Sequence, residues 1–309
     1  MNIKITQPNL FAAAIITCGL ASVALVSGCA SVAQVGTTIG QSAGVITPQQ
    51  AESINRSAVA VEKTFKDITP EQEYYIGRSV GATIASQYKI YNNDEANGYL
   101  NMVGQSVSRY SDMPETFKGY HFLILDTDEI NAFAAPGGFI FISRGMIRLC
   151  QTEDDLAAVC AHEVGHVQLR HAVGAIKSSR LTSALTTLAV EGSKSFGGEQ
   201  LAQLTEAFEG SITDITKTMM NSGYARGQER EADKVAILIL KRMGYMQASL
   251  PNVLTRMAKV LETDHRGFGA THPPADVRVK ELQPLIDDTQ TPVPTSVRQK
   301  RFARAISTI

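Results

Sequence analysis

The chain has 309 residues, of which 44% are hydrophobic and 19% are charged, so it can bury a large core and is not disordered as a whole. Its 29 basic and 30 acidic residues give a formal net charge of -1, which creates no field that would attract nucleic acid. Tryptophan is absent and only 6% of the residues are aromatic, which disfavours a platform for stacking bases. The composition therefore gives no support to a nucleic-acid-binding role.

The N-terminus has the features of a secretory signal. Lys4 precedes a run from Leu10 to Val26 that is almost wholly apolar or small. The run is close to the lower limit for crossing a bilayer, so a retained transmembrane helix is the alternative interpretation. The run ends in Val26-Ser27-Gly28-Cys29, which resembles the signal of bacterial lipoproteins. We therefore expect residues 1–28 to be removed and a lipid on Cys29 to hold the protein on a membrane.

The residue after this cysteine bears on the compartment. Ala30 stands where an aspartate would retain a bacterial lipoprotein in the inner membrane. The resemblance therefore points to the bacterial cell envelope and to the periplasmic face of the outer membrane. No later segment reaches about eighteen uninterrupted apolar residues, so we expect the mature chain to be anchored and not to span the bilayer.

Ordered structure is predicted to begin with two helices. Thr69-Pro70-Glu71-Gln72 combines an N-cap, a proline at the first helical position and a glutamine three residues after the cap. The first helix should run toward Tyr88. The second should cover Asp94 to Tyr110, where apolar residues recur at helical spacing.

The period then changes to that of strands. His121–Leu125 and Gly138–Ser143 are predicted strands, and Pro136-Gly137-Gly138 between them marks a turn. An exposed strand edge binds an extended peptide through main-chain hydrogen bonds, without demanding a particular sequence. The candidate residues for such a substrate-binding edge are Ala135, Gly137, Gly138, Phe139 and Ile140.

A helix predicted to begin at Thr152 carries His162-Glu163-Val164-Gly165-His166. Residues four apart share one face of a helix, so both imidazoles can reach the same metal ion. Glu163 is turned by about 100° from His162 and can approach water at the metal without being a ligand. Zinc-dependent hydrolysis needs this division between nitrogen ligands and a carboxylate base.

The same five residues also occur by chance, as two surface or capped histidines on an ordinary helix. Apolar side chains at Leu156, Val159 and Val164 instead predict that this helix is buried. Two histidines and a glutamate on a buried helix are costly unless they have a partner. The setting therefore favours a metal site.

A catalytic zinc ion has three protein ligands, so one more is expected. His171 lies nine residues after His162, about 180° around a continued helix, and is rejected. Glu229 and Asp233 lie four apart on one face of a second helix, where Glu229 could be the ligand and Asp233 could fix a histidine N–H. Glu231 faces about 200° away from Glu229, so only one of them can point inward. The alternative for this acidic group is a solvated helix face.

The sequence H-E-V-G-H followed by E-x-E-A-D resembles the gluzincin family of zinc endopeptidases that includes HtpX and the CaaX prenyl protease, over roughly Pro70 to Leu285. The lipoprotein signal makes the chain similar to the family's periplasmic lipoprotein branch, which includes LoiP and BepA. The resemblance implies an α+β fold, a mainly helical zincin-type domain with a small antiparallel sheet beside the motif helix.

The resemblance also implies a role for each matching residue. One Zn2+ per chain would be bound by His162, His166 and Glu229, Glu163 would be the catalytic base, and Asp233 would support the site. Tyr224 and Arg278 are candidates for supporting the transition state.

In the periplasmic branch, a histidine of a His-Pro segment can occupy the open position of the metal and hold the enzyme inactive. His272-Pro273 matches this segment, and Arg278 follows six residues later. The alternative is that His272 is a surface residue in a turn before a helix that starts near Ala275.

These inferences divide the chain into a signal peptide at 1–28, a lipidated N-terminus and tether at 29–67, a zinc metallopeptidase domain at 68–285 and a C-terminal tail at 286–309. Residues 172–220 are expected to form helices that either cover the active-site cleft or pack as a hairpin. Cys150 and Cys160 are expected to be free, buried thiols. The expected substrates are unfolded or misassembled envelope proteins, and the sequence leaves an oligomer open.

Two other functions compete with a quality-control protease. The first is a metal-free scaffold or chaperone that binds folding intermediates, and the presence of every expected catalytic residue argues against it. The second is a zinc hydrolase that acts on peptidoglycan peptides or on another small substrate.

Overall fold

In the computed structural model, the described residues are 68–176, 209–261, 275–287, 296–307 and 309. The signal, Cys29, the tether, His272 and most of the segment 172–220 lie outside these residues. Within the described part, none of the helices combines the length and the apolarity that crossing a bilayer requires. Residues Thr69–Ile309 group into one compact unit, which includes the helix Ser296–Ile306.

The first two helices begin as the sequence predicts. Helix α4 (Pro70–Gln87) has a capping box, in which Thr69 accepts a hydrogen bond from the Gln72 amide and Gln72 accepts one from the Thr69 amide. Helix α5 (Asp94–Ser108) is capped by the Asn93 side chain, which accepts from the Ala96 amide. The buried residues of α5 recur at helical spacing, as expected for a helix with one face in the core.

The sheet has three strands, β1 (His121–Leu125), β2 (Ala132–Ala135) and β3 (Phe139–Ser143), in the order β1-β3-β2. The α+β class and the mainly helical domain are confirmed, but the sheet is mixed and not wholly antiparallel. Strands β2 and β3 form an antiparallel hairpin. Strand β1 does not pair with β2, the next strand in the chain. It pairs with β3 instead, and the two run parallel.

The strand order corrects the predicted substrate-binding edge. Phe139 pairs with His121 on one side and with Ala135 on the other, and Ile140 likewise has partners on both sides. These two residues therefore lie on the central strand and cannot accept an added strand. Gly137 and Gly138 lie in the turn before it. Among the predicted edge residues, only Ala135 belongs to the outer strand β2.

The outer side of β1 is closed by side chains of α5. Asn101 donates to the Phe122 carbonyl at 2.6 Å and accepts from the Phe122 amide at 3.1 Å. Asn97 accepts from the Ile124 amide at 3.0 Å, and the Tyr91 amide donates to the Ile124 carbonyl at 2.8 Å. The outward backbone groups of Phe122 and Ile124 are thus satisfied, which blunts this edge of the sheet.

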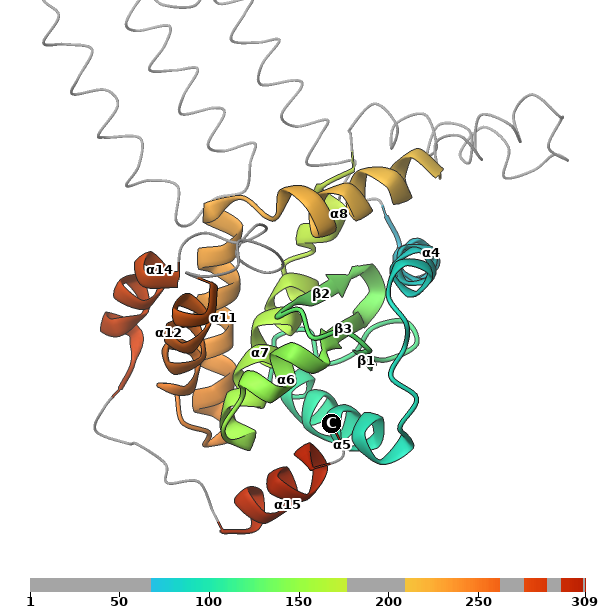
Figure 1. Cartoon of the computed structure of the whole chain (residues 1–309). Helices are drawn as coiled ribbons and strands as arrows, with labels where there is room; N and C mark the ends of the chain where they lie inside the picture. Colours follow the sequence, from blue (N-terminus) through green and yellow to red (C-terminus); the bar gives the residue numbers. More distant parts are fainter. Residues whose placement is uncertain (1–67, 177–208, 262–274, 288–295, 308) are drawn as a thin grey trace, which may run out of the picture. The chain divides into compact units, whose positions relative to one another are not determined.

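Helix α7 (Glu153–Gln168) is the centre of the domain (Figure 1). It lies between the sheet and helix α11 (Arg226–Met243), and it also packs against α5 and helix α12 (Ser249–Leu261). Every residue from Glu153 to Val167 is buried. Burial on all sides explains why the motif helix carries apolar residues around most of its circumference.

The acidic first turn of α7 is buried and paired with arginines. Glu153 is bound by Arg301 from helix α15 (Ser296–Ile306) and by the hydroxyls of Tyr99 and Tyr245, at 3.0 and 2.7 Å. The neighbouring acids have partners of the same kind. Asp154 pairs with Arg298 at 3.3 Å, and Asp155 pairs with Arg256 at 2.7 Å.

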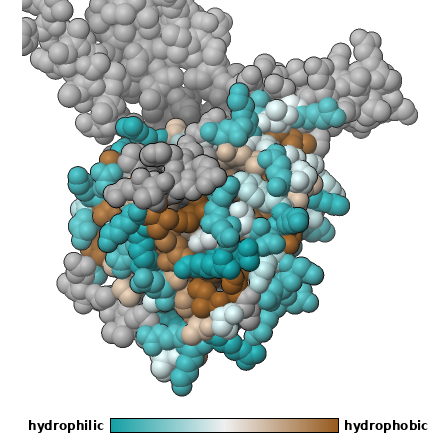
Figure 2. Space-filling model, in the orientation of Figure 1, coloured by the Kyte–Doolittle hydropathy of each residue, from teal (hydrophilic) through white to brown (hydrophobic). Residues whose placement is uncertain are grey.

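Shorter elements complete the fold. Helix α6 (Arg144–Leu149) follows β3, α8 (His171–Gly174) follows α7, the π-helix Thr218–Ser222 precedes α11, and α14 (Ala275–Leu282) leads into the 3-10 turn Gln283–Leu285. Figure 2 shows hydrophilic side chains around patches of hydrophobic ones on the face in view. Cys150 and Cys160 are free and buried, as predicted.

Candidate metal centre

The site forms where α7 passes α11. Gly165 lies at this crossing, and a Cβ atom placed on it would come within 3.0 Å of the Ala232 carbonyl oxygen. The absence of a side chain therefore lets the two backbones approach closely. Glu229 and Asp233 flank Ala232 on α11, and both are buried against α7. The close crossing thus brings the carboxylates of one helix to the histidines of the other.

We predict that Gly165→Val lowers the free energy of unfolding by about 1–3 kcal/mol, because its side chain would force α7 and α11 apart. Zinc binding should weaken as well, since Glu229 would move away from His162. Thermal unfolding and zinc titration against a chelator measure both effects. Gly98→Val is the matched control, because no atom lies within 4 Å of a Cβ at this exposed position of α5. Equal zinc affinity in the Gly165 variant and the wild type would contradict the prediction.

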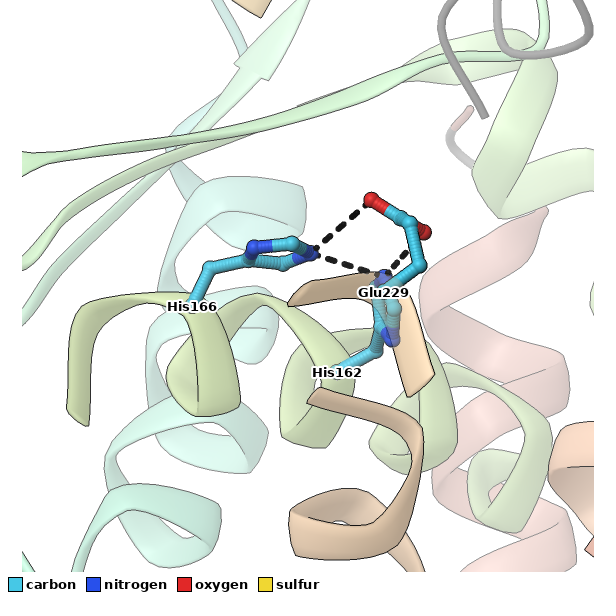
Figure 3. Close-up of side chains that lie close together, drawn as sticks. All are labelled: His162, His166 and Glu229. Atoms are coloured by element: carbon cyan, nitrogen blue, oxygen red, sulfur yellow. Dashed lines mark hydrogen bonds and ion pairs between the residues drawn. The ribbon is translucent and has the colours of Figure 1, made fainter. Parts of the chain in front are cut away.

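Three buried side chains converge on one point, as Figure 3 shows. The distance from His162 Nε2 to His166 Nε2 is 3.1 Å. Glu229 Oε2 lies 3.5 Å from His162 Nε2, and Glu229 Oε1 lies 3.4 Å from His166 Nε2. Ligands held about 2.0–2.1 Å from a tetrahedral zinc ion lie about 3.3 Å from one another. The three donor atoms therefore have the spacing and the chemistry that fit zinc.

Glu163 lies beside this group and is not part of it. Its side chain is buried, with 2% of the residue exposed, and its Oε1 atom has no hydrogen-bond partner within the described residues. Burial above all, with a smaller contribution from the charge of Glu229, raises the pKa of Glu163 to about 7, against the attraction of His162 and Arg278. A carboxylate with a pKa near 7 is suited to take and return a proton at neutral pH.

The other nitrogen of His162 is held by Asp233, whose Oδ1 atom lies 3.0 Å from His162 Nδ1. Arg278 donates two hydrogen bonds to Asp233, at 2.8 and 2.6 Å, and lies 3.3 Å from Glu229 Oε2. Burial opposes the ionisation of Asp233, but Arg278 and then His162 outweigh it and bring the pKa of Asp233 below its ordinary value. These contacts favour a role for Arg278 in holding the carboxylates.

The two histidines differ in how readily they hold a proton. Burial and Arg278 lower the pKa of His162, but its hydrogen bonds to Asp233 and Glu229 outweigh them and raise it to about 9. Burial lowers the pKa of His166 to about 4, against its hydrogen bond to Glu229. Without a metal ion, His162 therefore holds a second ring proton at neutral pH, whereas His166 stays neutral with one.

Tyr224 joins the site from the segment before α11. Its ring stacks on His166, with centroids 4.3 Å apart, and its hydroxyl lies 3.5 Å from the Ala134 carbonyl oxygen on β2. The chain reaches this position through the π-helix Thr218–Ser222 and Gly223, whose φ of 69° is unfavourable for other residues. Tyr224, a candidate for transition-state support, therefore lies between the candidate ligand His166 and the outer strand β2.

His171 reaches the site, although sequence reasoning placed it on the opposite side of the helix. Helix α7 ends at Gln168, and Arg170 turns the chain with a φ of 55°. His171 Nδ1 then lies 2.9 Å from His166 Nδ1. Burial and the neighbouring His166 lower the pKa of His171. It is not one of the three grouped donors, but it is a contact that the assumption of a continuous helix concealed.

Residues 94–286 match the model of Peptidase family M48. The Beta-barrel assembly-enhancing protease of Escherichia coli K12 is 26% identical over 220 residues, which are 71% of this chain and 44% of that protein. Mitochondrial metalloendopeptidase OMA1 of Schizosaccharomyces pombe is 27% identical over 172 residues, 54% of this chain and 46% of that protein.

A third relative, Metalloprotease LoiP of Escherichia coli K12, is 27% identical over 155 residues, 50% of this chain and 58% of that protein. The matched segment thus spans less than half the length of the assembly-enhancing proteases of Escherichia coli. The family match covers more than half of this chain and includes both helices that carry the three metal-binding candidates. The chain therefore belongs to peptidase family M48, a family of zinc-dependent metalloproteases.

Proposed function

We propose that this zinc metalloprotease is held in the bacterial cell envelope by a lipid on Cys29 and hydrolyses unfolded or misassembled envelope proteins. Residues 68–285 would be its metallopeptidase domain. The observation that carries the catalytic part is the convergence of His162, His166 and Glu229 beside the buried Glu163. Three ligands and a separate carboxylate base are the requirements of zinc-dependent peptide hydrolysis.

Glu163 would act as the general base and then as the general acid. A zinc ion bound by the three ligands would polarise the scissile carbonyl and lower the pKa of water. Glu163 would take a proton from the attacking water and return it to the leaving amine. Asp233 and Arg278 would keep His162 and Glu229 in place throughout.

Substrate would bind in extended form along β2 (Ala132–Ala135), the outer strand on the Tyr224 side of the sheet. Main-chain pairing with an edge strand selects extended chains and not a particular sequence. This mode of binding suits a protease of unfolded clients. The E. coli relative named for enhancing β-barrel assembly supports envelope proteins as the class of client.

Digestion of three candidate substrates tests the function. An unfolded outer-membrane β-barrel protein should be cleaved, the same protein after folding should resist, and peptidoglycan fragments should stay intact. Metal analysis should find about one zinc ion per chain. Cleavage of the cell-wall fragments alone would instead establish a peptidoglycan hydrolase, and binding of the unfolded protein without metal or cleavage would establish a chaperone.

We predict that Cys29→Ser releases the protein from the membrane fraction or blocks its processing, because no thiol then accepts the lipid. Cell fractionation and the mass of the mature N-terminus measure the effect. Cys18→Ser is the matched control, since this cysteine lies within the segment expected to be removed. A Cys29 variant that has the wild-type N-terminus and still sediments with the membrane would rule out the lipid anchor.

A further inference from the structure

The two ring nitrogens of His166 face different partners. Its Nε2 atom faces the other two metal-binding candidates, His162 and Glu229, and lies 3.4 Å from Glu229 Oε1. Its Nδ1 atom lies 2.9 Å from His171 Nδ1, and His171 Nε2 in turn lies 3.4 Å from Glu231 Oε2. Contacts therefore run from a candidate metal ligand through a second histidine to a carboxylate at the surface.

The metal at one end and the Glu231 carboxylate at the other fix where the ring protons of His166 and His171 lie. A neutral imidazole has one N–H donor and one acceptor nitrogen, and a nitrogen that binds a metal carries no proton. With Nε2 at the metal, His166 must carry its proton on Nδ1 and donate it to His171. His171 then accepts at Nδ1, so that its own proton lies on Nε2 and points to Glu231. Each contact has one donor and one acceptor only in this arrangement.

We propose that His171 and Glu231 are positioning residues, which set the tautomer and ring orientation of His166 for metal binding. The inference rests on the zinc site of the proposed function. Asp233 contacts His162 Nδ1 directly, whereas the carboxylate on the His166 side acts through an intervening imidazole. Partners of this kind fix the ring of a ligand histidine and increase its basicity.

The backbone before His171 supports a dedicated position for this side chain. Arg170 is the only residue other than glycine with a positive φ in the described part of the chain. Its guanidinium is held by Glu73 of α4, with Arg170 Nε 2.9 Å from Glu73 Oε2. Glu73 is itself buried, with only 3% of the residue exposed. A rarely populated conformation that is maintained by a distant, buried partner is typical of functional sites.

A satisfied core histidine is the competing explanation, since His171 is 5% exposed and packs near Tyr224. Glu231, which lies at the surface, allows the two explanations to be separated. The Glu231 side chain is 60% exposed, so its removal should leave packing and folding unchanged. An effect of Glu231 on the metal would have to pass through His171 and His166.

Two measurements on the full chain test the proposal. Zinc affinity is measured by competition with a chelator, and the visible absorption spectrum of the Co2+-substituted protein reports the ligand field. His171→Leu should weaken zinc binding by about 10- to 100-fold and alter the cobalt spectrum. Glu231→Ala should weaken it by about threefold to tenfold, since water can replace part of the carboxylate's role.

Two further variants are the controls. His171→Asn should retain most of the zinc affinity, because an amide oxygen can accept the His166 proton where Nδ1 did. Glu95→Ala should bind zinc as the wild type does. Glu95 is also an exposed carboxylate, but its salt bridge is with Arg304, at 2.8 Å, and not with a residue of the metal site.

Wild-type zinc affinity and cobalt spectra in both His171→Leu and Glu231→Ala would overturn the proposal. Equal losses in His171→Leu and His171→Asn, with Glu231→Ala unchanged, would assign His171 to packing alone. If His171→Leu does not fold, Glu231→Ala decides. Neither readout needs a peptide substrate. A wild-type protein that binds zinc but cleaves no envelope protein would therefore refute the proposed function and leave this inference standing.

Discussion

Glu163→Gln is expected to lower kcat/KM for peptide hydrolysis by about 10²- to 10⁴-fold while about one zinc ion stays bound per chain. Glutamine has the shape of glutamate but cannot take a proton from water. Glu163 is also not one of the three grouped metal-binding candidates, so its replacement should leave zinc affinity unchanged. Cleavage assays combined with metal analysis of the same preparation measure both expectations.

The melting temperature of this variant should not fall. A buried carboxyl whose pKa is raised to about 7 is costly to ionise, and a neutral amide removes that cost. Glu95→Gln is the matched control, because the same change at an exposed glutamate of α5 should leave kcat/KM at the wild-type value. Persistent cleavage by the Glu163 variant would exclude this residue as the base. If the Glu163→Gln variant also lost its zinc ion, Glu163 could be a base or a ligand. Glu163→Asp, which keeps a carboxylate, would separate the two roles: zinc retained with lowered activity would indicate the base.

Deletion of residues 296–309 is expected to lower the free energy of unfolding by about 3–5 kcal/mol, the cost of leaving a buried charge without its partner. The deletion removes Arg301 from Glu153 and Arg298 from Asp154, and both acidic side chains are fully buried. It also exposes the surface covered by Phe302. Urea unfolding followed by far-ultraviolet circular dichroism measures the change.

Neutral replacements identify the cause of this destabilisation. In the shortened chain, Glu153→Gln together with Asp154→Asn should restore part of the lost stability, because no buried charge is then left unpaired. Arg304→Ala in the full chain should change stability by less than about 0.5 kcal/mol, since its pair with Glu95 is exposed. A shortened chain as stable as the full one would show that α15 does not support α7.

The sequence was sufficient for those parts of the site that depend on local geometry. The spacing of four between His162 and His166, and again between Glu229 and Asp233, places each pair on one helix face whatever the rest of the fold is. Likewise, the capping box at Thr69 depends only on residues that are three apart. In each case the relevant contacts lie within one or two turns of the same helix.

The remainder depends on contacts between distant segments. The order of the strands is set by pairing of β1 with β3, which no local pattern specifies. The position of His171 follows from the end of α7 at a leucine and an arginine, neither of which ordinarily stops a helix. Glu73, 97 residues earlier in the chain, stabilises the turn at Arg170. The pairing of Glu153 with Arg301 spans 148 residues.

The asparagines of α5 have a consequence for the proposed work of the enzyme among unfolded chains. Such chains have unpaired strands that extend any open sheet, and growth from β1 would recruit them into an aggregate. Asn97 and Asn101 already bond three of the four outward backbone groups of Phe122 and Ile124, and the Tyr91 amide bonds the fourth. If substrate pairs with β2 as proposed, polypeptide capture would thereby be confined to that flank of the sheet, and the protease would be protected from co-precipitating with the material that it clears.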